Sequence, residues 1–257
     1  MKQVPDPEAP SSSFQVDPEA KRILPSKGTP PVLNPFDENA LEAALRMKDT
    51  QGAQITVISM GRNLAKPVVK KSLAAGADEL ILLEDDAFED LDSYSTACIL
   101  ASAISKIGEY DLVLCGRQAA DTDAGQVGSG IAEILQIPSV TAAGKIEAIN
   151  GKVRVERMVS DGYEVIEAPM PALVTASNEI GELRSATVQA LIEARKKPTT
   201  VWNAQELGAD PSRMKRVKLL RLFTPPRREA KCQVIEGETL EEAGANLALK
   251  LREAKTI

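Results

Sequence analysis

The fold is constrained most by a regular alternation of short apolar runs and amphipathic stretches between Asn34 and Thr141. Runs typical of buried strands occur at 54–61, 76–84, 111–116 and 137–141. Helical patterns lie at 34–49, 65–75, 93–107 and 126–135. Parallel strands need such crossovers, so the pattern predicts an α/β fold with a doubly wound, mostly parallel sheet covered on both faces.

The pattern changes after Thr141, where strand-like segments follow one another without helices between them. These segments lie at 145–149, 152–158 and 163–166, with turn residues at Asn150-Gly151 and 160–162. A last core strand is expected at 171–175 and a helix at 187–196. The sequence therefore predicts an antiparallel hairpin appended to the parallel sheet.

A boundary is expected at Pro198. Residues 1–197 would form a nucleotide-binding α/β domain, and residues 198–257 a proline-rich arm and helix that wrap a partner. Residues 217–223 are strand-like. The sequence Thr239-Leu240-Glu241-Glu242 is a capping box that predicts a final helix, with one apolar face formed by Leu240, Ala243, Leu247 and Leu251.

Charge and hydropathy exclude two classes of partner. The formal net charge of the 257 residues is -6, which disfavours binding to nucleic acid or to anionic membranes, because both need a basic surface. No apolar run approaches the roughly 20 residues that a membrane span needs. We therefore expect no nucleic-acid partner, no membrane span and a cytoplasmic location.

The chain contains no histidine, and its cysteines, Cys98, Cys115 and Cys232, lie far apart and outside any CxxC motif. The absence of histidine excludes Ser-His triads and the usual general base near neutral pH. Together with the spacing of the cysteines, it also excludes most zinc sites. We expect no metal site and no catalytic residue. A binding or carrier role follows, in which a cofactor supplies the chemistry.

Ligands of open parallel sheets bind beyond the carboxyl ends of the strands, and three segments are candidates there: 34–36, 59–61 and 117–130. In the third, small residues would let a phosphate approach the amides at a helix N-terminus. Asp121 and Asp123 are interpreted as helix caps or ribose ligands. The same composition is typical of an ordinary turn, but the position after a buried strand favours a nucleotide site.

Four segments in order along the chain resemble electron transfer flavoprotein β subunits. Residues 2–6 (KQVPD) resemble the opening loop of that family, 34–38 its N-P-F-x-E segment, and 121–128 its D-x-D-x-x-Q-x-G nucleotide loop. Residues 155–166 followed by 171–175 resemble the family signature V-x-[KR]…D-G…E and P-A-[LV]-V-[TS]. The resemblance spans nearly the whole chain.

The resemblance implies a Rossmann-like, adenine-nucleotide-binding subunit that forms a heterodimer with an α subunit. The α subunit would carry FAD near the interface, and this subunit would bind AMP or a second FAD. Electrons would come from flavin dehydrogenases such as acyl-CoA dehydrogenases and pass to a quinone reductase or another acceptor. Some family members split electron pairs, and Gln126-Val127-Gly128 resembles the FAD-binding members of that kind.

Individual site residues also follow from the resemblance. Nucleotide contacts are expected at Asn34, Pro35, Phe36, Asp37, Met60, Asp121, Thr122, Asp123, Ala124, Gly125, Gln126, Val127, Gly128, Ser129, Gly130, Ile131 and Ala132. Phe36 would also approach the flavin of the partner. Docking onto dehydrogenases is expected at Glu182, Arg184 and Val188, a segment equally typical of an exposed loop and helix cap.

Family members carry a hydrophobic strand before the Lys2-Gln3 segment, and this sequence starts at Met1 directly before it. A central strand would then be missing, with two unpaired edges and a slot in the core. We therefore expect the native chain to start upstream of Met1.

Two other functions fit an α/β fold. A stand-alone adenine-nucleotide-binding protein of the universal-stress type would be self-sufficient, and the proline-rich arm argues against it. A nucleotide alpha hydrolase or ligase would need a phosphate-activating loop and a catalytic base, and the sequence has no P-loop.

Overall fold

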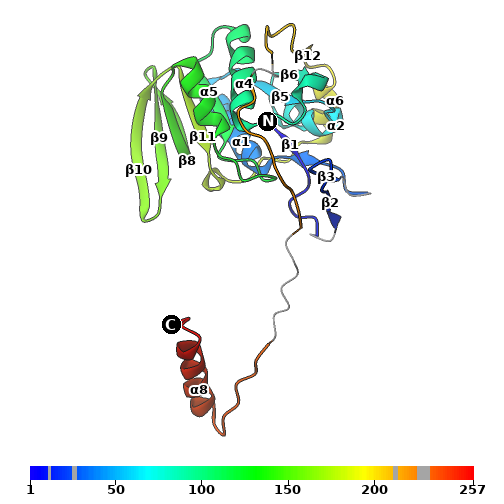
Figure 1. The fold of residues 1–257 in the computed structure, drawn as a ribbon. Coiled ribbons are helices and arrows are strands. Elements are labelled where there is room, and N and C mark those ends of the chain that lie inside the picture. The colour runs from blue at the N-terminus through cyan, green and yellow to red at the C-terminus, as the bar shows by residue number, and fades with distance from the viewer. Residues whose placement is uncertain (11–12, 25–27, 211–213, 225–231) are drawn as a thin grey trace. The chain divides into compact units, whose positions relative to one another are not determined.

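The computed structural model describes residues 1–10, 13–24, 28–210, 214–224 and 232–257 (Figure 1). The chain divides into a large unit, Met1–Leu222, and a small unit, Phe223–Ile257. Residues 198–222 therefore belong by their contacts to the large unit. The prolines at 211, 225 and 226 lie outside the described residues, and the partner-wrapping role of the arm stays a prediction.

Two sheets form the centre of the large unit. In the first, β5 (Thr56–Gly61), β6 (Glu79–Glu84) and β12 (Thr199–Trp202) are parallel, in the order β12-β6-β5. The second has the order β10-β9-β8-β11-β7 and contains β7 (Leu112–Gly116), β8 (Ser139–Ile149), β9 (Lys152–Val159), β10 (Gly162–Pro169) and β11 (Ala172–Ala176). Strands β7, β11 and β8 are parallel, whereas β8, β9 and β10 form the predicted antiparallel extension.

The expected single sheet is thus divided, because no strand among the described residues joins β5 to β7. Two short antiparallel pairs complete the strands: β1 (Gln3–Val4) with β4 (Val32–Leu33), and β2 (Gln15–Asp17) with β3 (Arg22–Leu24). The mixed α/β class with parallel strands is confirmed. The segment 217–223, expected to be strand-like, contains no strand.

Strand β8 joins two strands that the sequence suggested as separate. Its first half pairs in parallel with β11, and its second half pairs antiparallel with β9. The register shifts near Gly144, and Ala142 adopts a φ of 57°, as expected at a bulge that redirects a strand. A Cβ on Gly144 would lie 2.6 Å from the Met158 sulfur, so a larger residue there would require the Met158 side chain to move.

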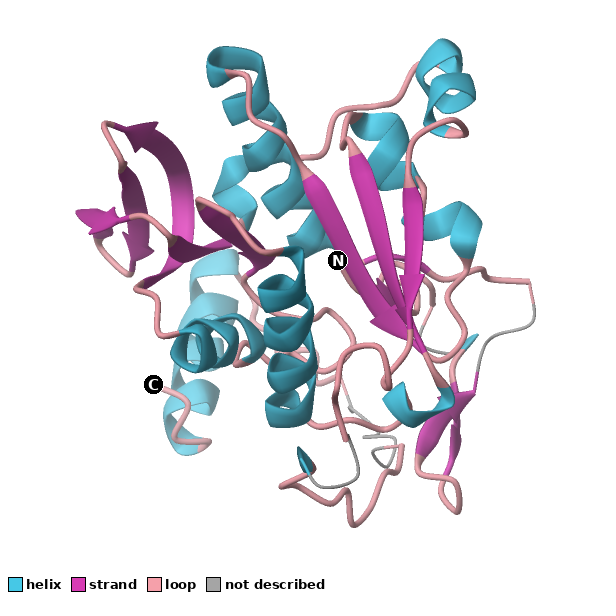
Figure 2. Ribbon diagram, turned by 90° about the horizontal axis from the view of Figure 1, so that it is seen from above, coloured by secondary structure: helices cyan, strands magenta, loops and turns pink. Residues whose placement is uncertain are grey.

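Helices cover both faces of the sheets (Figure 2). They are α1 (Pro35–Gln51), α2 (Lys66–Val69), α3 (Lys71–Ala75), α4 (Ser93–Ile107), α5 (Val127–Leu135) and α6 (Val188–Ala194), with α8 (Leu240–Glu253) in the small unit. Two 3-10 turns, η2 (Asp86–Phe88) and η3 (Asn178–Ile180), follow β6 and β11. In the described part of the chain, no helix is both long and apolar enough to cross a membrane.

Strand β6 shows why its sequence is apolar at successive positions. Leu80 and Leu82 join a core cluster with Leu41 of α1, whereas Ile81 and Leu83 join another with Ile99 of α4. Successive strand residues point to opposite faces, so a strand covered by helices on both sides is apolar throughout. All four residues are at most 3% exposed.

An ion pair between the buried Glu42 and the half-buried Arg184 joins α1 to the loop before α6. The Arg184 guanidinium donates to both carboxylate oxygens of Glu42, each at 3.1 Å, and also to Asp49 at 2.8 Å. Arg46 donates to Glu42 as well, at 3.1 Å. Burial raises the pKa of Glu42, but the hydrogen bonds from Arg184 and Arg46 outweigh it and hold this pKa below its ordinary value of 4.5.

A second anchor ties residues 216–217 to α4. One oxygen of Asp92 caps α4 by accepting from the Ser95 amide and hydroxyl, at 2.8 and 2.7 Å. The other accepts from the amides of Arg216 and Val217, at 2.5 and 2.7 Å. Burial opposes ionisation of Asp92, but these four hydrogen bonds lower its pKa strongly.

We expect Glu42→Gln to lower the free energy of unfolding at pH 7 by about 2–3 kcal/mol, the scale of charge-assisted buried hydrogen bonds. The pKa of Glu42 is lowered in the folded state, so its contribution is complete above pH 4.5 and is lost as the pH falls further. Urea unfolding of both chains between pH 7 and 3.5 measures how the difference in free energy of unfolding changes with pH. Glu147→Gln, in a surface ion pair with Lys145 on β8, is the control and should have a much smaller effect. A Glu42 effect that stays constant over this range would contradict the analysis.

Asp92→Ala should cost about 1 kcal/mol through the lost helix cap and should also release the backbone at Arg216. Trypsin cleavage after Arg216 is then expected to be faster than in the unaltered chain. Thr187→Ala removes a comparable cap on α6, where Thr187 accepts from the Ala190 amide at 3.1 Å, and should leave this cleavage unchanged. Equal acceleration by both variants would show that Asp92 does not hold the segment.

Candidate functional site

The candidate site lies at the carboxyl ends of β5 and β7, where α1 begins. Asn34 is only 2% exposed; its side chain donates to the Gln118 carbonyl at 2.9 Å and accepts from the Ala120 amide at 3.0 Å. Asn34 is the N-cap residue of α1, but its side chain makes no capping bond, because it is used to hold the loop after β7.

Asp37 reinforces the same junction from the first turn of α1. Its carboxylate accepts from the Gly116 amide at 3.0 Å and from the Lys2 amide at 2.5 Å. A Cβ on Gly116 would lie 2.5 Å from the Asp37 oxygen and 2.6 Å from the Phe36 carbonyl carbon. The close approach of α1 to the end of β7 therefore requires glycine at this position.

The two acidic residues of the loop do not cap α5, contrary to one of their two expected roles. Asp121 pairs with the Lys2 ammonium at 2.6 Å, and Asp123 accepts from the Gln118 amide group at 2.9 Å. Asp123 has a φ of 52°, a conformation that aspartate tolerates in turns. The ion pair with Lys2 offsets the negative charge that would otherwise repel a phosphate.

The N-terminus of α5 has the features of an anion site. Its N-cap, Gln126, makes no side-chain capping bond, and the amides of a first helical turn have no acceptor within the helix. Ser129 is exposed in that turn. The helix dipole adds a partial positive charge at the same end.

Two of the small residues in this segment also serve packing. A Cβ on Gly128 would lie 2.8 Å from Thr175 of β11, and one on Gly130 would lie 3.0 Å from Ala97 of α4. Ile131 and Ala132 are each 2% exposed and belong to the core beside α4. The sequence pattern alone does not separate these packing roles from contact with a ligand.

Other predicted residues are placed as follows. Phe36 is half-buried, and the Arg117 guanidinium carbon lies 5.3 Å from the centre of its ring. Pro35 is half-buried at the start of α1, and Met60 packs in the cluster around Phe88, on the α4 side of β5. Thr122, Gly125 and Gln126 are exposed, whereas Ala124 and Val127 are half-buried.

The individual nucleotide contacts expected from the sequence do not include Lys2 or Arg117, although Arg117 lies in the candidate segment 117–130 and both residues are cations at this edge. Two sequence features could have identified them as site residues: Lys2 lies in one of the family segments, and Arg117 directly follows a predicted buried strand. Among the described residues no group of three histidine, cysteine or acidic side chains is placed to hold a metal, and the three cysteines are free thiols.

The predicted docking residues lie in and before α6. Val188, Leu191 and Ile192 are 75%, 49% and 55% exposed and form an apolar surface on this helix, which we call the α6 surface. Glu182 is exposed. The guanidinium of Arg184 is engaged with Glu42 and Asp49, so in this structure it holds the loop against α1.

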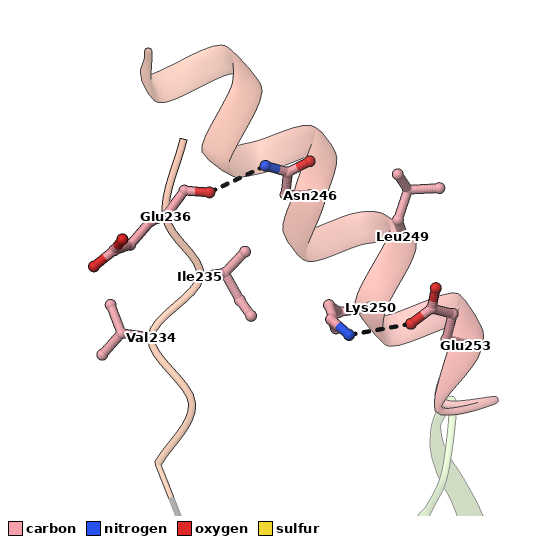
Figure 3. Close-up of a pocket in the computed structure, with 7 residues that line it drawn as sticks. All are labelled: Val234, Ile235, Glu236, Asn246, Leu249, Lys250 and Glu253. Carbon is pink, nitrogen blue, oxygen red and sulfur yellow. Dashed lines mark hydrogen bonds and ion pairs between the residues drawn. The ribbon is translucent and has the colours of Figure 1, made fainter. Parts of the chain in front are cut away.

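The small unit has a groove of its own, shown in Figure 3. It is lined on one side by Val234, Ile235 and Glu236, and on the other by α8. Asn246 donates to the Glu236 carbonyl at 3.0 Å. The predicted cap is confirmed, because Thr239 accepts from the Glu242 amide at 3.2 Å; no residue of α8 is buried within the unit, and Leu240 is 92% exposed.

Comparison of the sequence with known proteins identifies the family of the chain. Residues 26–207 match the model of the electron transfer flavoprotein domain. The chain is 39% identical to the caffeyl-CoA reductase-Etf complex subunit CarD of Acetobacterium woodii, covering 100% of this chain and 97% of that protein. It is also 39% identical to the electron transfer flavoprotein subunit beta of Thermoanaerobacterium thermosaccharolyticum, with 100% and 98% covered.

Two further relatives agree with this placement. The electron transfer flavoprotein subunit beta of Clostridium acetobutylicum is 41% identical, with 83% of this chain and 80% of that protein covered. Protein FixA of Azorhizobium caulinodans is 32% identical, with 96% and 91% covered. The chain therefore belongs to the electron transfer flavoprotein family.

Proposed function

We propose that this chain is the β subunit of an electron transfer flavoprotein and carries electrons only as a heterodimer with an α subunit that holds FAD. The observation that carries the proposal is the full-length similarity to proteins named as β subunits, together with an open helix N-terminus at the carboxyl edge of the strands. The universal-stress alternative is not favoured, since the relatives belong to another family.

The nucleotide of this subunit, AMP or a second FAD, would bind at the N-terminus of α5. The first-turn amides and the Ser129 hydroxyl would bind its phosphate. Asn34 and Asp37 would act as positioning residues, because they hold residues 116–120 against α1. Gln126-Val127-Gly128 supports FAD in preference to AMP, and the flavin would supply the redox chemistry.

Phe36 and Arg117 would form the face of the site toward the partner subunit. An aromatic ring stacked under a guanidinium offers a flat, cationic surface, which suits a planar ring system that carries negative charge when reduced. The α6 surface would be the place where flavin dehydrogenases, such as acyl-CoA dehydrogenases, dock. A quinone reductase or another acceptor would receive the electrons.

Co-expression with a candidate α subunit tests the function directly. A yellow heterodimer with flavin absorbance is expected, and the count of bound flavin distinguishes the nucleotides. Two FAD per heterodimer would support electron bifurcation, whereas one FAD and one AMP would support simple transfer. A colourless, monomeric product that hydrolyses ATP would contradict the proposal.

Ser129→Asp should weaken binding of AMP or FAD to the nucleotide-stripped heterodimer by about tenfold or more, because a carboxylate in the first turn competes with phosphate for the same amides. The melting temperature should not fall, since an acid near a helix N-terminus stabilises the helix. Titration calorimetry measures the affinity. Ser105→Asp, on the exposed end of α4, is the control; Ser129→Ala, which removes only the hydroxyl, should weaken binding less than Ser129→Asp. Unchanged affinity in Ser129→Asp would exclude a phosphate at α5.

Val188→Glu should raise the KM for the flavoprotein in electron transfer from its dehydrogenase at least several-fold, because a charge would have to be desolvated in an apolar contact. Its kcat should change less, and flavin content should stay the same. Val165→Glu on the exposed edge strand β10 makes the same change away from α6. If both variants raise KM equally, docking does not occur at the α6 surface.

A further inference from the structure

Helix α6 carries the α6 surface but makes little apolar contact with the rest of the large unit. Of its seven residues, all of which the structure describes, only Ala194 is buried. Ala194 belongs to the core cluster of α1 and α3, together with Leu73. Because an alanine side chain buries little apolar area, packing alone does little to fix the position of this helix.

Lys197, shortly after the end of α6, supplies a polar attachment. Its ammonium donates to the carbonyls of Leu73 and Ala77, at 2.8 and 2.6 Å. Both carbonyls lie in or just beyond the last turn of α3, where backbone acceptors lack partners within the helix and the helix dipole favours a cation. Burial lowers the pKa of Lys197, as expected of an ammonium partly withdrawn from water. These two bonds therefore tie the C-terminal end of α6 to α3.

The other end of the same segment is held by Arg184, in the loop before α6. Its guanidinium is paired with Glu42 and Asp49 of α1. Helix α6 is thus held on both sides, before its first residue and after its last, by charge-assisted hydrogen bonds or bonds from a cation to carbonyls. Two fixed ends limit the conformations open to α6 before a partner binds. A surface that is already ordered binds at a lower entropic cost.

The Lys197 contact lies at the opposite edge of the sheet from the candidate nucleotide site. Ala77 comes shortly before β6, and Lys197 shortly before β12, so the contact is at the amino ends of these parallel strands. The nucleotide site was assigned above to the carboxyl ends of β5 and β7. A change at Lys197 can therefore alter α6 without changing a residue of the nucleotide site.

We propose that Lys197 is a positioning residue for docking, which together with Arg184 holds the α6 surface in the orientation that a flavin dehydrogenase binds. The inference rests on the proposed function, because it requires docking at the α6 surface. Loss of the Lys197 ammonium frees the C-terminal end of α6 and leaves Val188, Leu191 and Ile192 in place. Docking then weakens, because the helix must be ordered on binding, whereas electron transfer within the docked complex does not change.

Lys197→Met and Lys48→Met, each in the heterodimer, test the proposal as a matched pair. Lys48 also binds at the end of α3, donating to the Gly76 carbonyl at 3.0 Å and to Asp78 at 2.5 Å, but it comes from α1. Both variants remove an ammonium from the same region and should lower the melting temperature. Hydrogen exchange of the α6 amides should become at least about tenfold faster in Lys197→Met only.

Steady-state electron transfer from the flavin dehydrogenase gives the second readout. Lys197→Met should raise the KM for the flavoprotein at least about threefold, because a less ordered surface binds more weakly. Its kcat and its content of flavin and nucleotide should stay the same. Lys48→Met should leave KM, kcat and cofactor content unchanged.

Unchanged α6 exchange or an unchanged KM in Lys197→Met would overturn the proposal. Equal changes in Lys197→Met and Lys48→Met would also overturn it, since a general loss of stability would then explain both. Val188→Glu separates this inference from the proposed function. If Val188→Glu raises KM and Lys197→Met does not, only the role of Lys197 is wrong; if neither raises KM, docking at the α6 surface is wrong as well.

Discussion

The hydrogen bonds of Asn34 and Asp37 hold together the edge on which the proposed site depends. Both side chains come from the start of α1, and both bind backbone groups between Gly116 and Ala120. Backbone polar groups at the end of a strand need partners when they are screened from water. By supplying these partners, α1 determines where the loop before α5 can lie, and hence where a phosphate could reach the helix N-terminus.

Charge at this edge is balanced in a way that suits an anionic ligand. Asp121 is paired with Lys2, Asp37 is engaged with amides, and Arg117 lies over Phe36 and donates to the Gln118 side chain. The acids that seem unfavourable for phosphate binding are therefore used within the protein. The N-terminus of α5 and the Arg117 guanidinium over the Phe36 ring are then the positive groups available to a ligand at this edge.

Two exposed apolar regions agree with a protein that works with partners. The α6 surface follows a loop that the Glu42–Arg184 ion pair holds against α1. The small unit shows the opposite arrangement, since α8 buries none of its residues within that unit. Apolar side chains exposed to this extent are typical of interaction sites, in keeping with the proposal that this chain works as a subunit of a complex.

Local patterns in the sequence determined which segments form helices and strands. Long-range contacts determined how these helices and strands are arranged and which side chains meet at the site. The alternation of apolar runs predicted the parallel strands, the helix at 93–107 coincides with α4, and the capping box at Thr239 begins α8. These features depend on periodicity and on residues within one or two turns, which a sequence displays directly.

Only the tertiary structure showed that Asn34 binds the loop 84 residues away, that Lys2 pairs with Asp121 across 119 residues, and that Arg184 meets Glu42 across 142. It also showed that β8 is one bent strand and that β5 and β7 lie at the edges of two separate sheets. Such contacts are set by how strands are ordered and how closely helices pack on them. Neither property leaves a local pattern, because each depends on residues that are far apart in the sequence.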